Sequence, residues 1–474
     1  MQPSHSDKPN KSPLHFPEGF LWGAATSHFQ VEGHPKEINN SLSDWAAWTK
    51  EEGRIVDKSS ADDACQFYYR FEDDLQLVKD LNLNAFRLSF NWPALLSANP
   101  SGSLSQVSLD QGEVDYYKRI LSGLKESGIK TFGTLFHFCL PGELALAGGW
   151  LSPETADHFA KFSELLAREL DQYVDYWITI NEPLAYAYQG YVGGQWPPGV
   201  KHDYLSAFRA IRGLLLGHGK AYDAIKSVND RAPVSFTCHW RPFMPKNKLS
   251  PLDRMVRFYR DYVFNHLFPL SVETGNMDFP FPLKMSGDVK RICGEVPGLK
   301  GKMDYLAINY YTRELSQFKP GFPIDIFGEN SVEFELPINE MGWEIFPKGL
   351  HDLLVGDSRR YQFDSSGNQR DVIITENGYA AMFPPHLSEG DWSLLDHKRV
   401  DYILTHLAEL HRAIADGVNV KGYLHWSLID NFEWAEGLSA RFGLVRVSYP
   451  TQERLMRESA KIYREIARTN SVSL

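Results

Sequence analysis

The sequence has few cysteines and lacks the motifs of several common enzyme classes. None of its four cysteines forms a C-x-x-C pair, which argues against a zinc knuckle or a thioredoxin-like site. No G-x-S-x-G elbow of a serine hydrolase and no H-E-x-x-H metal motif occurs. We therefore expect neither a metal nor a cofactor. The wide spacing of the cysteines fits reduced thiols, although spacing alone does not exclude a disulfide.

Long apolar runs and clusters of positive charge are also missing. No stretch of about 18 apolar residues is present, so no membrane span is expected. The net charge is -11, from 49 Lys+Arg against 60 Asp+Glu, and no basic run occurs, which argues against nucleic-acid binding. Residues 1–15 are polar and lack the apolar core of a secretory signal. These features predict a cytoplasmic protein with a flexible tail at residues 1–15.

Short apolar runs alternate with longer segments of helical periodicity along the rest of the chain. Because parallel strands need long crossovers, this alternation indicates βαβ units, and eight of them predict one (β/α)8 TIM barrel over residues 16–474. The predicted strands are Phe20–Phe29, Asn84–Trp92, Lys130–Phe138, Val174–Asn181, Pro233–Cys238, Asp304–Tyr311, Val372–Glu376 and Val418–Ser427. The predicted helices include Met255–Glu273, His397–Asp416 and a last one over Arg454–Arg468.

An open, doubly wound sheet is the alternative fold. It would normally carry a glycine-rich phosphate turn after its first strand, and no G-x-G-x-x-G occurs in the sequence. The irregular stretch from Glu314 to Gly342 is long for a connection. In a barrel, long loops of this kind are expected at the C-terminal face.

Two predicted strands end in a glutamate beside an asparagine. The fourth ends in Asn181-Glu182-Pro183, and the seventh in Thr375-Glu376-Asn377-Gly378. Barrel enzymes carry their catalytic groups at these strand ends, and a pair of carboxylates facing one cavity suits glycoside hydrolysis. A single strand-end glutamate is more often a helix cap or a surface ion pair. Two in matching contexts favour a catalytic site.

These motifs resemble those of the family 1 glycoside hydrolases, the β-glucosidase family. The resemblance covers about Phe16 to Tyr463, in order and with similar spacing. It also includes Phe16-Pro17-Glu18-Gly19-Phe20-Leu21-Trp22-Gly23 at the first strand, Asn309-Tyr310-Tyr311-Thr312 at the sixth, and Trp426-Ser427-Leu428-Ile429-Asp430-Asn431-Phe432-Glu433-Trp434 at the eighth.

The resemblance implies a retaining β-glycosidase. Glu376 matches the nucleophile and Glu182 the acid/base, while Arg87 and Tyr311 match residues that keep the nucleophile ionised. Two carboxylates about 5–5.5 Å apart cannot both ionise easily, so Glu182 is expected to hold a proton near neutral pH while Glu376 is charged.

The same resemblance implies a sugar-binding shell. Its members are Gln30, His137, Phe138, Asn181, Asn309, Trp343, Trp426, Glu433, Trp434 and Phe442. Glu433 stands where branches that cleave 6-phosphosugars tend to carry serine, and a carboxylate would repel a phosphate. We therefore expect terminal β-glucosides, and also galactosides and fucosides, without phosphate. Core packing is an equally simple explanation for Trp426 and Phe442 taken alone.

The sequence departs from the family at the third strand. The family usually reads His-Trp-Asp-Leu-Pro there, whereas this chain has His137-Phe138-Cys139-Leu140-Pro141. Phe138 lacks an indole N–H, a loss of about 1 kcal/mol of hydrogen bonding to the sugar. A transglycosylase would use the same two glutamates and is the alternative function. A sugar-binding protein without hydrolytic activity would be expected to lack one of them.

Overall fold

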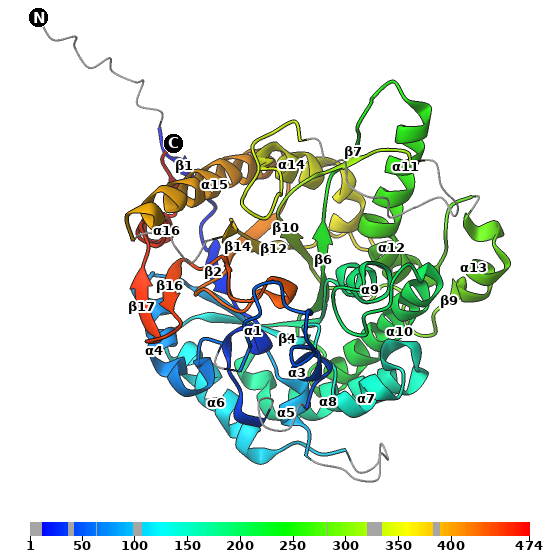
Figure 1. Ribbon diagram of the computed structural model, residues 1–474, viewed down its shortest axis with the longest axis horizontal. Coiled ribbons are helices and arrows are strands. Elements are labelled where there is room, and N and C mark those ends of the chain that lie inside the picture. Colours follow the sequence, from blue (N-terminus) through cyan, green and yellow to red (C-terminus); the bar gives the residue numbers. More distant parts are fainter. Residues whose placement is uncertain are drawn as a thin grey trace, which may run out of the picture.

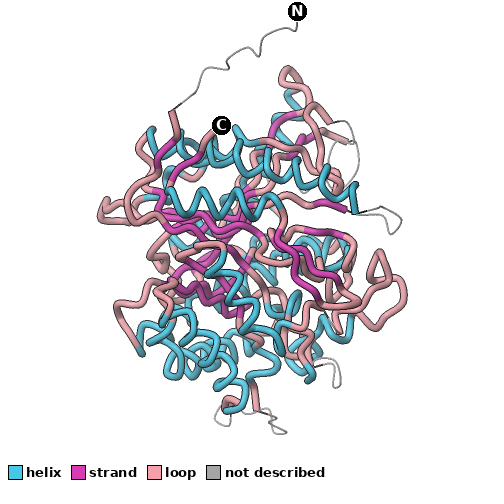
Figure 2. The backbone as a smooth tube through the Cα atoms, turned by 90° about the vertical axis from the view of Figure 1, so that its left-hand side faces the viewer, coloured by secondary structure: helices cyan, strands magenta, loops and turns pink. Residues whose placement is uncertain are grey.

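Eight parallel strands form a closed barrel in this computed structural model, which describes residues 12–36, 42–62, 64–97, 107–281, 283–319, 334–382 and 389–474 (Figures 1 and 2). The barrel strands are β2 (Leu21–Ala25), β3 (Ala85–Ser89), β4 (Lys130–Phe136), β5 (Tyr176–Asn181), β6 (Val234–Trp240), β10 (Leu306–Tyr310), β12 (Val372–Asn377) and β14 (Val420–Trp426). They follow one another around the barrel in chain order, and β14 closes onto β2. The predicted TIM barrel is confirmed.

The barrel interior is packed with apolar side chains. Strands buried on both faces read as continuous apolar runs, which is why these segments could be recognised in the sequence. One interior cluster comprises Ala85, Phe132, Ile178, Tyr305, Ala307, Ile373 and Leu424. Gly23 faces the backbone of Ala85 so closely that a Cβ would lie 2.7 Å from the Ala85 carbonyl oxygen. Only glycine fits where β2 and β3 approach each other.

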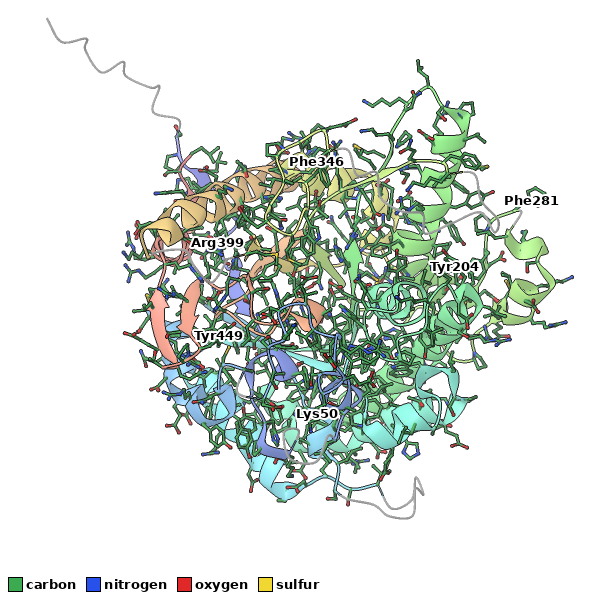
Figure 3. The ribbon with its side chains drawn as sticks, in the orientation of Figure 1. Lys50, Tyr204, Phe281, Phe346, Arg399 and Tyr449 are labelled. Carbon is green, nitrogen blue, oxygen red and sulfur yellow. The ribbon has the colours of Figure 1, made fainter. Side chains whose placement is uncertain are left out.

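Helices surround the barrel as an outer ring, with side chains filling its centre (Figures 1 and 3). The longer helices are α4 (Phe67–Asp80), α6 (Gln111–Glu126), α8 (Pro153–Leu170), α10 (Tyr204–Val228), α11 (Pro251–Asp261), α12 (Leu267–Thr274), α15 (Glu389–Ala415) and α16 (Glu458–Thr469). The shorter ones are α1 (His28–Val31), α3 (Asp44–Trp48), α5 (Trp92–Leu95), α7 (Gly142–Leu146), α9 (Pro183–Tyr188), α13 (Gly287–Ile292) and α14 (Pro347–Asp352).

The last predicted helix begins later than expected, and a second one is interrupted. Glu453–Met456 forms strand β17, which pairs antiparallel with β16 (Val445–Ser448), so the prediction of helix from Arg454 is wrong for these residues. Their exposure alternates with a period of two, as in a strand with one face covered. The segment predicted as one helix over Met255–Glu273 contains a π-helical turn at Tyr262–His266, between α11 and α12.

Short strands outside the barrel tie loops and termini together. They are β1 (Leu14–His15), β7 (Phe243–Pro245), β8 (Asn276–Met277), β9 (Gly294–Glu295), β11 (Glu314–Ser316), β13 (Ala381–Met382), β15 (Ala440–Arg441) and β18 (Ser471–Val472). Because β1 pairs with β18, residues 14 and 15 belong to the fold, although they were predicted to end a flexible tail. Residues 1–11 of that tail and residues 320–333 of the long loop lie outside the described residues.

Three sequence expectations concern features outside the barrel itself. The four cysteines form no disulfide with one another, which fits their wide spacing. Among the described helices, none is both long and apolar enough to cross a membrane. Within the same described part of the chain, no three His, Cys, Asp or Glu side chains gather as a metal site would require.

Candidate active site

A pocket lies at the C-terminal ends of the barrel strands. Most of the predicted site residues line it: His137, Phe138, Asn181, Glu182, Tyr311, Trp343, Glu376, Trp426, Glu433, Trp434 and Phe442. The other three, Gln30, Arg87 and Asn309, lie behind this surface and bond to residues that line it. The structure thus brings together side chains from strands that are hundreds of residues apart in the sequence.

Glu376, at the end of β12, is held by both of its carboxylate oxygens. The Arg87 guanidinium on β3 forms an ion pair with Oε1, and the Tyr311 hydroxyl donates a hydrogen bond of 2.7 Å to Oε2. Arg87 itself is fully buried. Burial raises the pKa of Glu376 to about 7; Arg87 opposes this rise and the charge of Glu182 adds to it.

Glu182 follows β5 and occupies a left-handed backbone conformation, with a φ of 43°. Pro183 then begins α9, so the strand ends at the glutamate and its side chain turns into the pocket. Asn309 on β10 donates a hydrogen bond of 2.7 Å to Glu182 Oε1, and His239 Nδ1 lies 3.6 Å from Oε2. A non-glycine residue in this backbone region is strained, and such strain concentrates at functional sites.

With a protonated His239, the two carboxyl groups would titrate in the reverse of the order expected from the sequence. Burial raises the pKa of Glu182, but the charge of a protonated His239 and the Asn309 amide outweigh burial and lower it below its usual value. That order therefore depends on a positive charge on His239. Burial and the neighbouring Arg241 lower the pKa of His239, so the imidazole is neutral near pH 7 and the positive charge is absent. With a neutral His239, the proton shared by the pair belongs on Glu182.

A hydrogen-bond chain fixes the histidine on the other side of the site. Arg87 donates to Asn181 Oδ1 at 2.7 Å, so the Asn181 amide nitrogen points the other way, 3.2 Å from His137 Nε2. The amide is the donor in this contact, which leaves the His137 proton on Nδ1. That buried Nδ1 has no hydrogen-bond partner within the described chain. It is a donor placed for a polar group of a ligand.

Gln30 and Glu433 form a second polar pair at the pocket wall. Gln30 Nε2 donates to Glu433 Oε2 at 3.0 Å and to Asn431 Oδ1 at 3.1 Å, and Gln30 Oε1 accepts from Ser27 at 2.6 Å. Burial raises the pKa of Glu433 to about 8, and the nearby charge of Glu376 adds to this, whereas Gln30 lowers it. Glu433 is therefore a half-buried carboxyl that a ligand hydroxyl can reach.

Aromatic rings close the remaining sides of the pocket. Ala25, Tyr311, Ala380, Trp426 and Phe442 form one buried cluster, and Trp343 packs against it at a ring-centroid distance of 6.2 Å from Phe442. On the other side Phe138 has a φ of 71° and packs against Trp196 and Trp434 at 4.7 and 5.2 Å. Flat apolar walls with a few buried polar groups are typical of sugar sites.

Several pocket residues were not predicted from the sequence. They are Ala185, Gln189, Gln195, Trp196, His239, Arg241, Met341, Ala435 and Glu436. His239 and Arg241 could have been found by the rule that found the two glutamates, because they lie at the C-terminal end of a barrel strand. The predicted strand ended at Cys238, but β6 runs to Trp240, so the chemically active end of this strand was overlooked.

A barrel whose strand ends present two buried glutamates to an aromatic-walled pocket has the architecture of a glycoside hydrolase. Comparison with known proteins agrees. The model of the glycosyl hydrolase family 1 matches residues 12–472. Beta-glucosidase A of Thermotoga maritima is 35% identical over 460 residues, covering 96% of this chain and 98% of that protein. The bifunctional beta-D-glucosidase/beta-D-fucosidase of Bifidobacterium breve is 33% identical over 96% of this chain and 99% of that protein.

Solved structures lead to the same family. The family 1 b-glucosidase from Thermotoga maritima superimposes with a TM-score of 0.85 at 32% identity, covering 98% of this chain and 100% of that one. The chain belongs to glycosyl hydrolase family 1. It is a glycoside hydrolase of the β-glucosidase type.

Proposed function

We propose that the protein cleaves terminal β-glycosides with retention of configuration, with Glu376 as nucleophile and Glu182 as acid/base. The observation that carries this proposal is the unequal setting of the two carboxyls. Glu376 is fixed through both oxygens by a buried cation and a hydroxyl, which suits a group that attacks as an anion. Glu182 meets a neutral amide and an imidazole, which suits a group that gains and loses a proton.

The reaction then takes two displacements. Glu376 attacks the anomeric carbon while Glu182 gives its proton to the leaving oxygen, which yields a glycosyl ester on Glu376. Glu182, now a carboxylate, takes a proton from water as that water attacks the ester. Arg87 and Tyr311 stabilise the negative charge of the Glu376 carboxylate before it attacks and after the sugar leaves it.

The glycone side of the pocket favours neutral sugars. Glu433, held in place by Gln30, offers an acceptor to sugar hydroxyls, and His137 Nδ1 offers a donor. Of the described residues that line the pocket, Arg241 is the one lysine or arginine, and it lies beside His239 at Glu182 rather than at Glu433. A phosphate at the sugar 6-position would meet a carboxyl and no cation. We propose β-glucosides, β-galactosides and β-fucosides without phosphate as substrates.

The location of the protein is part of the proposal. Four cysteines that form no disulfide with one another, three of them buried, support a reducing compartment such as the cytoplasm.

Azide rescue tests the roles of the two glutamates. Glu376→Gly is expected to lose at least about 10⁴-fold in turnover and, with azide, to release an α-glycosyl azide by a single inversion. Glu182→Ala is expected to keep its first step on a 2,4-dinitrophenyl glycoside, which needs no acid, and to release a β-glycosyl azide. A Glu376→Gly variant with the turnover of the unchanged enzyme would refute the assignment.

A substrate panel tests specificity and the alternative function. Aryl β-glucoside, β-galactoside and β-fucoside are compared with aryl 6-phospho-β-glucoside by kcat/KM. A higher value for the phosphorylated substrate contradicts the proposal. Methanol added to the same assay measures transglycosylation: a methyl glycoside as main product at low methanol would make the protein a transglycosylase.

A further inference from the structure

His239 and Arg241, at the end of β6, stand behind the proposed acid/base. His239 is 6% exposed, and its Nδ1 lies 3.6 Å from Glu182 Oε2. Its other ring nitrogen, Nε2, accepts a hydrogen bond of 3.2 Å from Arg241 Nε. The three side chains therefore form a row, from the guanidinium through the imidazole to the carboxyl. No step of the reaction described above uses His239 or Arg241.

The chemistry of arginine decides where the histidine proton lies. A guanidinium has only donors and does not lose its charge in proteins, so the nitrogen that faces it must be an acceptor. His239 Nε2 is therefore unprotonated, and its single proton lies on Nδ1, the nitrogen directed at Glu182. In this row the imidazole is a neutral donor whose tautomer is set by Arg241.

The surroundings hold this row in place. Arg241 is anchored by Glu314 Oε2 at 3.3 Å and packs over the Phe264 ring at 5.2 Å. The imidazole is wedged between Phe264 and Tyr311, with ring centroids 5.7 and 5.4 Å away. The charged and titratable groups around the row are Glu182 after β5, Cys238 on β6, Arg260 on α11, Tyr311 after β10, Glu314 on β11 and Glu376 on β12.

We propose that His239 is a positioning residue for the acid/base Glu182, and that Arg241 locks it in the tautomer that donates from Nδ1. This inference rests on the proposed role of Glu182. The separation of 3.6 Å is just longer than a hydrogen bond, and catalytic contacts of this length often tighten in the transition state.

The contact between His239 Nδ1 and Glu182 Oε2 stabilises the two protonation states of Glu182 unequally. While Glu182 is protonated, it needs no donor on Oε2. Once it has given its proton to the leaving oxygen, the carboxylate gains a hydrogen bond from Nδ1–H, and the same bond aims it at the incoming water. No proton leaves His239 at any point. The residue thus favours the charged form of Glu182 between the two steps and lowers the pKa of the free acid.

The test compares three variants at this position and its partner. His239→Phe removes the donor and keeps a ring, His239→Asn restores a donor, because its amide nitrogen occupies the place of Nδ1, and Arg241→Met removes the tautomer lock. The measurements are pH profiles of kcat/KM with an alkyl β-glucoside, which needs an acid, and with 2,4-dinitrophenyl β-glucoside, which does not.

A hydrogen bond to a charged group shifts a pKa by about one unit or more. Removing the donor raises the pKa of Glu182, so protonated acid persists to higher pH. The basic limb of the alkyl-glucoside profile should move up by about one unit in His239→Phe, by less in Arg241→Met, and should return to its original position in His239→Asn. The dinitrophenyl profile should keep its basic side. Nitrogen-15 NMR of the unchanged protein should show the Nδ1–H tautomer from pH 6 to 8.

Two results overturn the inference. One is a basic limb that stays within about 0.2 pH units in a folded, active His239→Phe. The other is an imidazolium, or an Nε2–H tautomer, in the NMR spectrum at pH 7. Glu182→Gln separates this failure from failure of the proposed function. If that variant keeps the basic limb and the activity on alkyl glucosides, Glu182 is not the acid, whatever His239 does.

Discussion

Replacing Arg87 tests whether a buried cation keeps the nucleophile ionised. Arg87→Met retains most of the side-chain volume but removes the ion pair with Glu376 and the hydrogen bond to Asn181. The change leaves a buried carboxyl with the Tyr311 hydroxyl as its remaining direct donor among the described residues. Because burial already raises the pKa of Glu376 to about 7, loss of the cation must raise it further.

The size of this effect follows from the strength of a charged hydrogen bond. Such a bond is worth about 1.5–3 kcal/mol, or about one to two pKa units. At pH 7 the carboxyl with a pKa of about 7 is about half ionised, and after the change about 1–10% is ionised. We therefore expect kcat/KM at pH 7 to fall about 5- to 50-fold. Breaking a fully buried pair should also cost about 3–5 kcal/mol of the free energy of unfolding.

The assay uses 2,4-dinitrophenyl β-glucoside, because its leaving group needs no acid and kcat/KM then reports attack by Glu376. A carboxyl with a raised pKa ionises at higher pH, so the acid limb should move up by one to two units and activity should recover toward pH 9. Arg399→Met is the matched control: Arg399, on α15 and labelled in Figure 3, is equally buried and paired with Asp396 outside the pocket. It should lose stability without moving the acid limb. An Arg87→Met enzyme with an unmoved acid limb would refute the reasoning.

Three further predictions concern the pocket wall and the carboxyls. Tyr311→Phe removes one neutral donor from Glu376. The acid limb of the kcat/KM profile of this variant should therefore move up by about half a pH unit to one pH unit, less than in Arg87→Met. Phe138→Trp adds an indole N–H and should raise kcat/KM for aryl β-glucoside about fivefold, whereas Phe138→Leu should not. The folded pKa of Glu433, about 8, exceeds its value of about 4.5 when exposed, so its contribution to stability is complete below pH 4.5 and is lost as pH rises through 8. Glu433→Gln cannot ionise and avoids this loss. Its free energy of unfolding, measured by thermal unfolding, should therefore rise relative to that of the unchanged protein by up to roughly 4 kcal/mol between pH 5 and 8. A difference that stays constant over this range would contradict the prediction.

The barrel could be predicted from the sequence because its strands are buried on both faces. Such strands appear as apolar runs, and each of the eight overlaps a strand of the structure. The two glutamates could be found because Pro183 and Gly378 mark where their strands end. Short strands such as β17 were not predicted. Four residues with one covered face are too few to show a clear alternation, and a helix begins shortly after them.

The polar contacts of the site could not be derived from the sequence. Arg87, Asn181 and Glu376 come from three strands, and their bonds depend on the register of the closed barrel. The protonation order of the pair depends on His239. This residue was overlooked because the predicted strand ended at Cys238, two residues before the end of β6. The resemblance to a family identified most of the residues that line the pocket. It did not identify the contact between His239 and Glu182, because His239 lies outside the family motifs.

The seam between β2 and β14 has a consequence for synthesis of the chain. Leu21 pairs with Gly422 and Ala25 with Trp426. β2, the first barrel strand to leave the ribosome, therefore cannot complete its pairing until β14, the last, has been synthesised. Until residue 426 emerges, the nascent sheet has two open edges, and open edges invite pairing with other chains. A chain stopped before Val420 should therefore aggregate, whereas loss of the last few residues, beyond the seam, should leave a closed barrel. Timing of synthesis, as well as final stability, sets how much protein reaches the native state.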